Sequence, residues 1–269
     1  MATPNGILTL LTDFGTRDAY VAAMKGAACS IHPDVRLVDI THEIPPQDVM
    51  QAAFVLRDSW RFFPPGTVHV AVVDPGVGTT RHAVALRHGD HYFVGPDNGL
   101  FSLVLQDEPD EAVILDRPEM WRTPEPSKTF HGRDIFAPAA ARLAAGTPLS
   151  ELGSPLSALT RLHWALPIHD EAGIRGWVVH IDRFGNCITN VTSEAFQDGR
   201  SGRRFKCYAG TVILNKIQET YAAVEGGDPL LLFNSADLLE IAVSRGNAAE
   251  LYGLHTGSPI NVVFLDGQV

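Results

Sequence analysis

Apolar and polar positions follow two alternating patterns in the first half of the chain. Short apolar runs at 7–11, 35–40 and 68–73 have the length of buried strands. Between them, apolar residues recur at helical spacing over 20–31, where Pro33 ends the pattern, and over 48–62. Further short strands are expected at 84–86 and 92–94, and a helix at 135–145. This alternation predicts an α/β domain with a mostly parallel sheet.

The last third of the chain shows a different pattern. Strand-like runs at 177–181, 203–209, 212–214, 230–233, 238–243 and 260–265 are separated by Gly, Asn, Asp and Pro. Such spacing is typical of a small β-sandwich or barrel. Residues 153–173, between the two patterns, are rich in Pro, Gly and Ser. We therefore predict an α/β domain at 1–160 and a smaller all-β domain, barrel- or sandwich-like, at 174–269.

Composition narrows the class of protein. Of 269 residues, 45% are hydrophobic and 19% charged, which is typical of a globular chain. Acidic residues outnumber basic ones, 31 to 21, which argues against a nucleic-acid partner. No apolar stretch reaches the roughly 18–20 residues of a membrane span. Residues 1–6 contain no basic region before an apolar run, so a secretory signal is not expected. The three cysteines have no C-x-x-C spacing, so free thiols and a cytoplasmic location are expected.

Aspartates follow several predicted strands. Asp13 and Asp74 come directly after two of them, at the end of a sheet where α/β proteins bind ligands. One such aspartate is more often a helix cap or turn residue, but several beside glycines favour a ligand site. The glycine-rich segment 74–81 matches neither phosphate-binding glycine motif. Arg81, at its end, either pairs with Asp74 across the turn or is solvated.

Three further polar segments are candidates for a site. His131 is distinguished from the other ten histidines by Phe130 before it and by Gly132, which permits close approach, ahead of a helix. Without an H-E-x-x-H motif or a Cys/His cluster, neither a metal nor another cofactor is expected. Segment 182–186 and the pair at 234–235 lie at strand ends, where a turn explains them as well as a site does.

Taken in order, these segments resemble the S-adenosylmethionine (SAM) hydroxide adenosyltransferase family, which is related to the fluorinase and chlorinase enzymes. The matching stretches are 11–15, 18–20, 73–78, 96–99, 129–134, 181–186 and 246–249, across nearly the whole chain. The resemblance implies hydrolysis of SAM to adenosine and L-methionine. It also implies homotrimers whose sites lie between the N-terminal domain of one subunit and the C-terminal domain of its neighbour.

The resemblance also implies roles for individual residues. It assigns Asp74, Arg81 and His131 to the attacking water, and leaves open which of Asp74 and His131 takes the proton. Other matching positions bind the ribose, the methionine portion, the adenine or an unspecified part of the substrate. Asp13 falls at the ribose, Asp18 and Asp182 at the methionine portion, Asn186, Tyr221 and the backbone at Asn247-Ala248 at the adenine, and Phe130, Ser235 and Glu240 complete the set.

Halogenating relatives differ from this chain at informative positions. They have a tryptophan where Gln47 stands and a tyrosine where Asp74 stands, and an additional loop after the strand at 84–86 is absent here. These differences favour water over halide as the nucleophile. Three alternatives stay open: a halogenase of the same family, a metal-dependent phosphohydrolase built on the strand-end aspartates, and a non-catalytic protein that binds adenosine or SAM.

Overall fold

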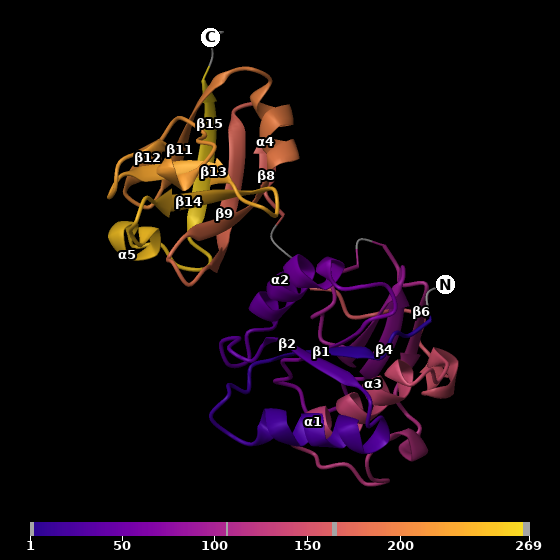
Figure 1. The fold of residues 1–269 in the computed structure, drawn as a ribbon. Helices are drawn as coiled ribbons and strands as arrows, with labels where there is room; N and C mark the ends of the chain where they lie inside the picture. Colours follow the sequence, from indigo (N-terminus) through magenta and orange to yellow (C-terminus); the bar gives the residue numbers. More distant parts are fainter. Residues whose placement is uncertain (1–2, 106, 163–165, 266–269) are drawn as a thin grey trace. The chain divides into compact units, whose positions relative to one another are not determined.

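The computed structural model describes residues 3–105, 107–162 and 166–265. The chain divides into two compact units, Met1–Leu162 and His163–Val269 (Figure 1). Each unit has a hydrophobic core of its own. Within the described residues, no helix has the length and apolar character needed to cross a membrane.

The N-terminal unit is built on a mixed sheet. Its strands lie in the order β2-β1-β3-β5-β4-β6-β7. The pairs β1–β2, β1–β3 and β3–β5 are parallel, whereas β4–β5, β4–β6 and β6–β7 are antiparallel. The prediction of a mostly parallel sheet is therefore wrong. The strands are β1 (Ile7–Thr12), β2 (Arg36–Thr41), β3 (Val68–Val72), β4 (Ala83–His88), β5 (His91–Pro96), β6 (Glu111–Ile114) and β7 (Ser154–Pro155).

A short hairpin accounts for the change of direction. Gly89 and Asp90 alone connect β4 to β5, and a two-residue connection returns the chain antiparallel, because parallel neighbours need a crossover of about a dozen residues. Gly89 has a φ of 58°, the left-handed value that tight hairpin turns require. The periodicity located both strands but carried no information on their direction, and it missed β6 and β7.

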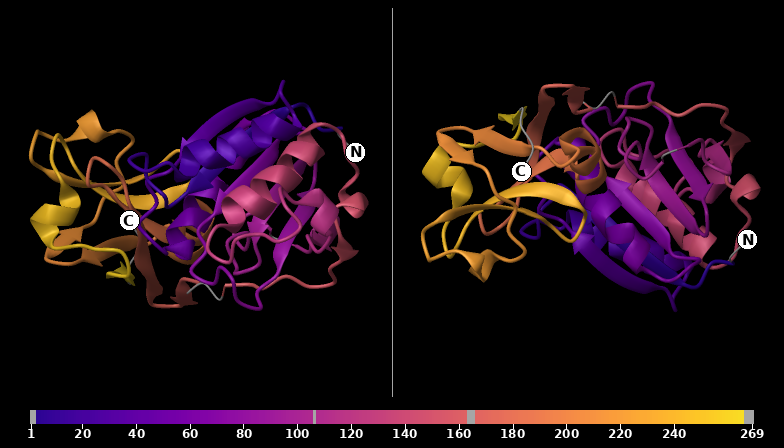
Figure 2. Two further views of the ribbon diagram at one scale, coloured as in Figure 1. Left: turned by 90° about the horizontal axis from the view of Figure 1, so that it is seen from below. Right: turned by 90° about the horizontal axis from the view of Figure 1, so that it is seen from above.

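Helices cover both faces of this sheet. Helices α1 (Tyr20–Ile31) and α3 (Ala137–Ala144) lie side by side on one face, and α2 (Val49–Ser59) lies on the other (Figures 1 and 2). Because successive strand residues point to opposite faces, Leu10 packs in one core with Met24 of α1, while Leu11 packs in another with Leu56 of α2. This arrangement leaves the carboxyl ends of β1 and β3 together at one edge.

The predicted helices are confirmed with shifted ends. The first matches α1. The second, expected over 48–62, begins after Asp48, whose side chain accepts a hydrogen bond from the Gln51 N–H, and ends in a 3₁₀ turn, Trp60–Phe62. The third, expected over 135–145, is α3 preceded by a π-helical turn, Gly132–Phe136.

The C-terminal unit is a nearly closed antiparallel barrel, as predicted. Its strands lie in the order β12-β11-β15-β9-β10-β14-β13, with β8 paired to β9. A bridge between Ile217, which follows β12, and Leu231 of β13 brings the two ends of this order close together. The strands are β8 (Ile168–Asp170), β9 (Gly173–Ile181), β10 (Cys187–Thr192), β11 (Arg204–Ala209), β12 (Val212–Leu214), β13 (Pro229–Phe233), β14 (Leu238–Val243) and β15 (Pro259–Leu265).

Sequence analysis did not predict β8, β10 or the two helices of this unit. Thr192 ends β10 and begins α4 (Ser193–Arg200), since its hydroxyl accepts a hydrogen bond from the Ala195 N–H at 3.1 Å. Phe196 is the one buried residue of α4, and a single apolar position is too weak a signal to give helical periodicity. The second helix, α5 (Ala248–Tyr252), has five residues.

Candidate active site

A cavity of about 640 Å³ opens at the edge of the N-terminal sheet where β1 and β3 end. Asp13 follows β1 and Asp74 follows β3, so the two parallel strands deliver both carboxylates to the same place. The wall of the cavity is formed by residues from several segments of the unit. They are Asp13, Phe14, Tyr20, Pro46, Gln47, Val72, Asp74, Pro75, Val77, Thr129, Phe130, His131 and Gly132. A cavity of this size suits a small-molecule ligand.

Three side chains from two distant loops contact one another beside this cavity, and two of them, Asp74 and His131, line it. Arg81 Nε donates to Asp74 Oδ1 at 2.9 Å, and Nη2 donates to Asp74 Oδ2. The same Nη2 lies 2.9 Å from His131 Nδ1. The guanidinium also lies over the Phe136 ring, 5.3 Å from its centroid. Of the two alternatives that the sequence left open for Arg81, the structure shows the pair with Asp74, and this pair is nearly buried, with side chains 10% and 6% exposed.

Glycine allows these two loops to approach each other. Gly78 has a φ of 75°, and a Cβ at this position would collide with the Lys128 carbonyl oxygen. The turn is closed by hydrogen bonds from the Val77 N–H to the Asp74 carbonyl and from the Thr79 N–H to the Gly76 carbonyl. The segment therefore serves close packing of loops, consistent with its mismatch to phosphate-binding motifs.

The surroundings of His131 favour its neutral form. Burial, and then the Arg81 cation, lowers the pKa of His131 below its ordinary value of 6.5. The negative charges of Asp74 and Asp134 act in the opposite direction without reversing the shift. The net shift therefore favours the neutral imidazole at neutral pH.

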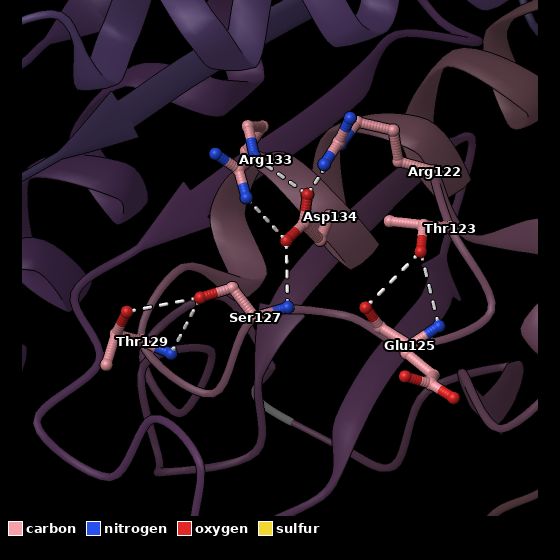
Figure 3. A network of polar contacts seen from close by, with 7 residues as sticks. All are labelled: Arg122, Thr123, Glu125, Ser127, Thr129, Arg133 and Asp134. Carbon is pink, nitrogen blue, oxygen red and sulfur yellow. Dashed lines mark hydrogen bonds and ion pairs between the residues drawn. The ribbon is translucent and has the colours of Figure 1, made fainter.

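Asp134 organises the segment that leads into His131, as Figure 3 shows. Its fully buried carboxylate accepts hydrogen bonds from Arg122 Nε at 2.6 Å, from Arg133 Nε at 2.7 Å and Nη2 at 2.8 Å, and from the Ser127 N–H at 2.9 Å. Burial alone would raise the pKa of Asp134, but these donors hold it well below the ordinary 3.8. These hydrogen bonds to Asp134 hold the π-helical turn that begins at Gly132. A π-helical turn is often found at functional sites.

The loop that carries Asp13 is held from two sides. Asp13 Oδ2 accepts a hydrogen bond from the Gln47 N–H at 2.8 Å, and Gln47 has a φ of 68°, which is unusual for a residue with a side chain. From the other side, buried His42 contacts Thr12 Oγ1 through Nδ1 at 2.9 Å and accepts the Gly15 N–H at its carbonyl oxygen. Asp39 lies 3.1 Å from His42 Nε2.

Aromatic rings form another part of the wall. Phe14, Tyr20 and Phe130 contact one another with ring centroids 5.2–5.8 Å apart. Asp18 lies in the exposed loop before α1 and is not among the described residues that line the cavity. Phe130, which sequence analysis included, lines it.

A second polar cluster lies in the C-terminal unit. Asp182 Oδ1 accepts the backbone N–H groups of Phe184 and Asn186, and Oδ2 accepts the Asn186 side-chain amide, each at 2.9 Å. The hydroxyl of half-exposed Tyr221 donates to Oε1 of Glu240 at 2.7 Å, and Glu240 is only 2% exposed. Burial raises the pKa of Glu240, with a further contribution from Asp182. These four predicted residues therefore form two hydrogen-bonded pairs. One lies in the turn between β9 and β10, and the other joins the 3₁₀ turn Tyr221–Ala223 to β14, which pairs with β10.

Two other predicted residues flank this cluster. Gly185 has no room for a side chain because Asn247 packs against it, and its carbonyl accepts the Ala249 N–H. This contact places the start of α5, where Ala248 is buried, against the turn at 182–186. Ser235 is exposed in the turn between β13 and β14.

Sequence analysis missed four residues that shape the cavity. Phe14 and Tyr20 belong to the quoted segments 11–15 and 18–20, but their contacts depend on the packing of α1. Gln47 entered the analysis only through a comparison with halogenating enzymes. Asp134 ends the quoted segment 129–134, and the adjacent Arg133 was its available signal in the sequence. Its burial and its second arginine partner, Arg122, appear only in the structure.

No group of three or more His, Cys, Asp and Glu side chains that could hold a metal ion occurs among the residues described. The three cysteines are free, with Cys187 and Cys207 buried and Cys29 exposed.

Comparisons with known proteins cover both units. The sequence profile described as the SAM hydroxide adenosyltransferase N-terminal domain matches residues 8–153, and the profile of the C-terminal domain matches residues 176–261. The chain is 42% identical over 267 residues to a protein of Thermus thermophilus named (R)-S-adenosyl-L-methionine hydrolase, covering 94% of this chain and 98% of the relative. A protein of Methanocaldococcus jannaschii with the same name is 35% identical over 268 residues, covering 96% of each chain.

More distant relatives carry a different name. A protein of an Actinoplanes species named fluorinase is 30% identical over 297 residues, covering 97% of this chain and 98% of the relative. Among solved structures, a protein of Thermotoga maritima is similar with a TM-score of 0.89 and 35% identity, covering 95% of this chain and 99% of that one.

Proposed function

Because the chain belongs to the SAM hydroxide adenosyltransferase family, we propose that its N-terminal cavity is where water attacks SAM. The protein is a SAM hydrolase, which forms adenosine and L-methionine. The observation that carries the proposed site is the contact of one guanidinium with both Asp74 and His131 at the cavity.

The chemistry of SAM explains why so few groups are needed. The C5′ carbon is bonded to a sulfonium, so methionine leaves as a neutral thioether and needs no general acid. The remaining tasks are to place a water oxygen in line with the C5′–S bond and to remove its proton. Positioning contributes up to about 7–11 kcal/mol in well-oriented systems, and general-base assistance about 10²–10⁴-fold in rate. Asp74, Arg81 and His131 provide the polar groups for both tasks.

Other cavity residues suit the nucleoside. We assign the ribose to Asp13, because a carboxylate can accept hydrogen bonds from two adjacent hydroxyls and the Gln47 N–H already fixes its orientation. Phe130, with Phe14 and Tyr20, offers aromatic faces that attract a sulfonium cation.

The second polar cluster is proposed to complete the site in a homotrimer. There, Asn186, Tyr221 and the backbone at Ala248 bind the adenine, while Asp182, together with Asp18 of the N-terminal unit, binds the methionine portion. Ser235 and Glu240 belong to the same binding set. The Tyr221–Glu240 hydrogen bond supports this assignment because it holds one flat aromatic face in a fixed place. The free cysteines are consistent with the proposed cytoplasmic location.

The direct test is to incubate the purified protein with SAM and separate the products by chromatography. We expect equimolar adenosine and methionine, unchanged by a metal chelator. The Asp74→Ala variant should lose turnover by about 10²-fold or more while adenosine affinity, measured by calorimetry, changes little.

Three outcomes would contradict the proposal. Formation of 5′-halo-5′-deoxyadenosine in chloride or fluoride buffer would identify a halogenase. Binding of SAM without turnover would identify a binding protein. Loss of activity with a chelator would point to metal-dependent hydrolysis.

A further inference from the structure

We infer that Asp74 is the general base of this hydrolysis, and that His131 remains neutral and donates a hydrogen bond from Nε2 to the attacking water. The inference rests on the proposed function and deepens it by assigning the proton. It follows from counting the donors and acceptors around Arg81.

A guanidinium carries five N–H donors and no acceptor. Arg81 directs Nε and Nη2 at the two oxygens of Asp74, Nη2 also at His131 Nδ1, and Nη1 at the His82 carbonyl oxygen at 3.3 Å. Since the guanidinium can only donate, the ring nitrogen that faces it must accept. Nδ1 of His131 therefore presents a lone pair to Arg81 and carries no proton.

This contact fixes the tautomer of His131. A neutral imidazole has one N–H and one lone pair, so with the lone pair on Nδ1 the proton is on Nε2. Such a ring has no free lone pair with which to take a proton from water. Protonating Nδ1 would place two N–H donors, and two cations, against each other at 2.9 Å. The charged groups facing His131 are Arg81, Asp74 and Asp134, and burial together with Arg81 lowers its pKa.

Asp74 keeps free lone pairs that can accept a proton from water, which His131 lacks. A carboxylate has about four lone-pair positions, and Arg81 occupies one on each oxygen. Asp74 also lines the cavity, whereas Arg81 is not among the described residues that do so. Arg81 therefore orients both partners from outside the cavity wall, and Asp74 has lone pairs left for a water molecule.

The proposed step balances. The water oxygen accepts the His131 Nε2–H with one lone pair and forms the bond to C5′ with the other. The C5′–S bond breaks, and its electron pair stays on sulfur, giving neutral methionine. The water proton passes to the Asp74 carboxylate, which later releases it to solvent, so that water and SAM yield adenosine, methionine and one proton.

The tautomer can be measured without any turnover. In protein labelled with ¹⁵N-histidine, the side-chain nitrogen shifts of His131, assigned by comparison with the His131→Gln variant, report which nitrogen carries the proton. We expect the neutral Nε2–H form at about pH 7.5. A neutral Nδ1–H form, or an imidazolium at this pH, would overturn the inference even if adenosine is formed.

The size of the loss in kcat/KM tests the base. We expect Asp74→Asn, whose amide cannot take up the water proton, to lose about 10²–10⁴-fold. His131→Gln, which retains a side-chain N–H donor, should lose about 10-fold, the value of roughly one hydrogen bond. His131→Phe, without a donor, should lose more than His131→Gln. A larger loss in His131→Gln than in Asp74→Asn would make His131 the base and refute the inference. Failure of the wild-type protein to form adenosine would instead refute the proposed function.

Discussion

At the scale of single residues, two histidines of the N-terminal unit are kept neutral by different means. His131 faces a guanidinium donor at the cavity, whereas His69 lies in the core, where Nδ1 contacts Thr9 Oγ1 at 2.8 Å and Nε2 contacts His91 Nδ1 at 3.1 Å. Burial, followed by the neighbouring His91, lowers the pKa of His69 to about 3. The first histidine has a proposed catalytic role, and the second makes the fold sensitive to acid.

Folding stability should therefore decrease below pH 6.5. In that range the unfolded chain binds a proton at His69 that the folded chain excludes until about pH 3, so the free energy of unfolding falls by up to about 1.4 kcal/mol per pH unit. Urea unfolding at pH 7.5, 6 and 5 should show a smaller pH dependence for His69→Gln than for the wild-type protein. Exposed His82 provides the control, and His82→Gln should behave as wild type. Equal dependence in His69→Gln and wild type would contradict the prediction.

At the scale of elements, the cavity depends on two loops whose close approach is set by backbone geometry. One is the turn between β3 and β4, and the other is the segment before α3 with its π-helical turn. Gly78 brings the first against the second, and Asp134 gives the second its shape. Neither residue lines the cavity, so each acts on activity by positioning Arg81 and His131.

Gly78 can be compared with Gly89, which also has a positive φ but where an added Cβ would meet nothing within 4 Å. Each alanine substitution should cost about 1–2 kcal/mol of stability through the left-handed backbone. Gly78→Ala should in addition lower kcat/KM for adenosine formation by at least 10-fold, because the turn must move away from Lys128. Equal activities of the two variants would show that close approach of the loops is not required.

Asp134 has a matched control in Asp58. Both aspartates follow an arginine in sequence and pair with it, but the Asp58 side chain is 30% exposed, whereas that of Asp134 is 0% exposed and has three partners. Asp134→Asn should cost about 2–3 kcal/mol of stability, since a buried charge pair loses one member. Asp58→Asn should cost under about 1 kcal/mol. Denaturant unfolding measures both losses of stability. A similar loss in the two variants would show that the buried hydrogen bonds of Asp134 stabilise the protein no more than the exposed pair of Asp58 does.

At the scale of the whole molecule, the polar residues proposed for the site lie mainly in two clusters, one in each compact unit. The cluster at the N-terminal cavity contains the groups proposed to activate water. The cluster of the barrel contains those proposed to hold the adenine and the methionine portion. The proposed homotrimer joins one cluster to the other between neighbouring subunits.

Mixed trimers test this assembly. Asp74→Asn and Asp182→Asn should each be inactive alone, because each disables one cluster. If the two variants are co-expressed and assort randomly, roughly a quarter of all sites in the trimer population combine two intact clusters. We therefore expect recovery of up to roughly a quarter of wild-type activity, with the trimer mass checked by light scattering. No recovery in a verified mixture would place both clusters of a site in one subunit.

Local spacing and residue type were enough to predict the elements with strong periodicity and the change to a β-rich second unit. The residues proposed to carry the chemistry came from the resemblance of the ordered segments to a known family. Tertiary structure alone decided the mixed direction of the first sheet, since apolar runs do not encode how a strand pairs. It also decided the partnership of Arg81 with His131, 50 residues away. A hydrogen bond between distant loops depends on backbone packing, and that bond is what assigns the proton of the imidazole.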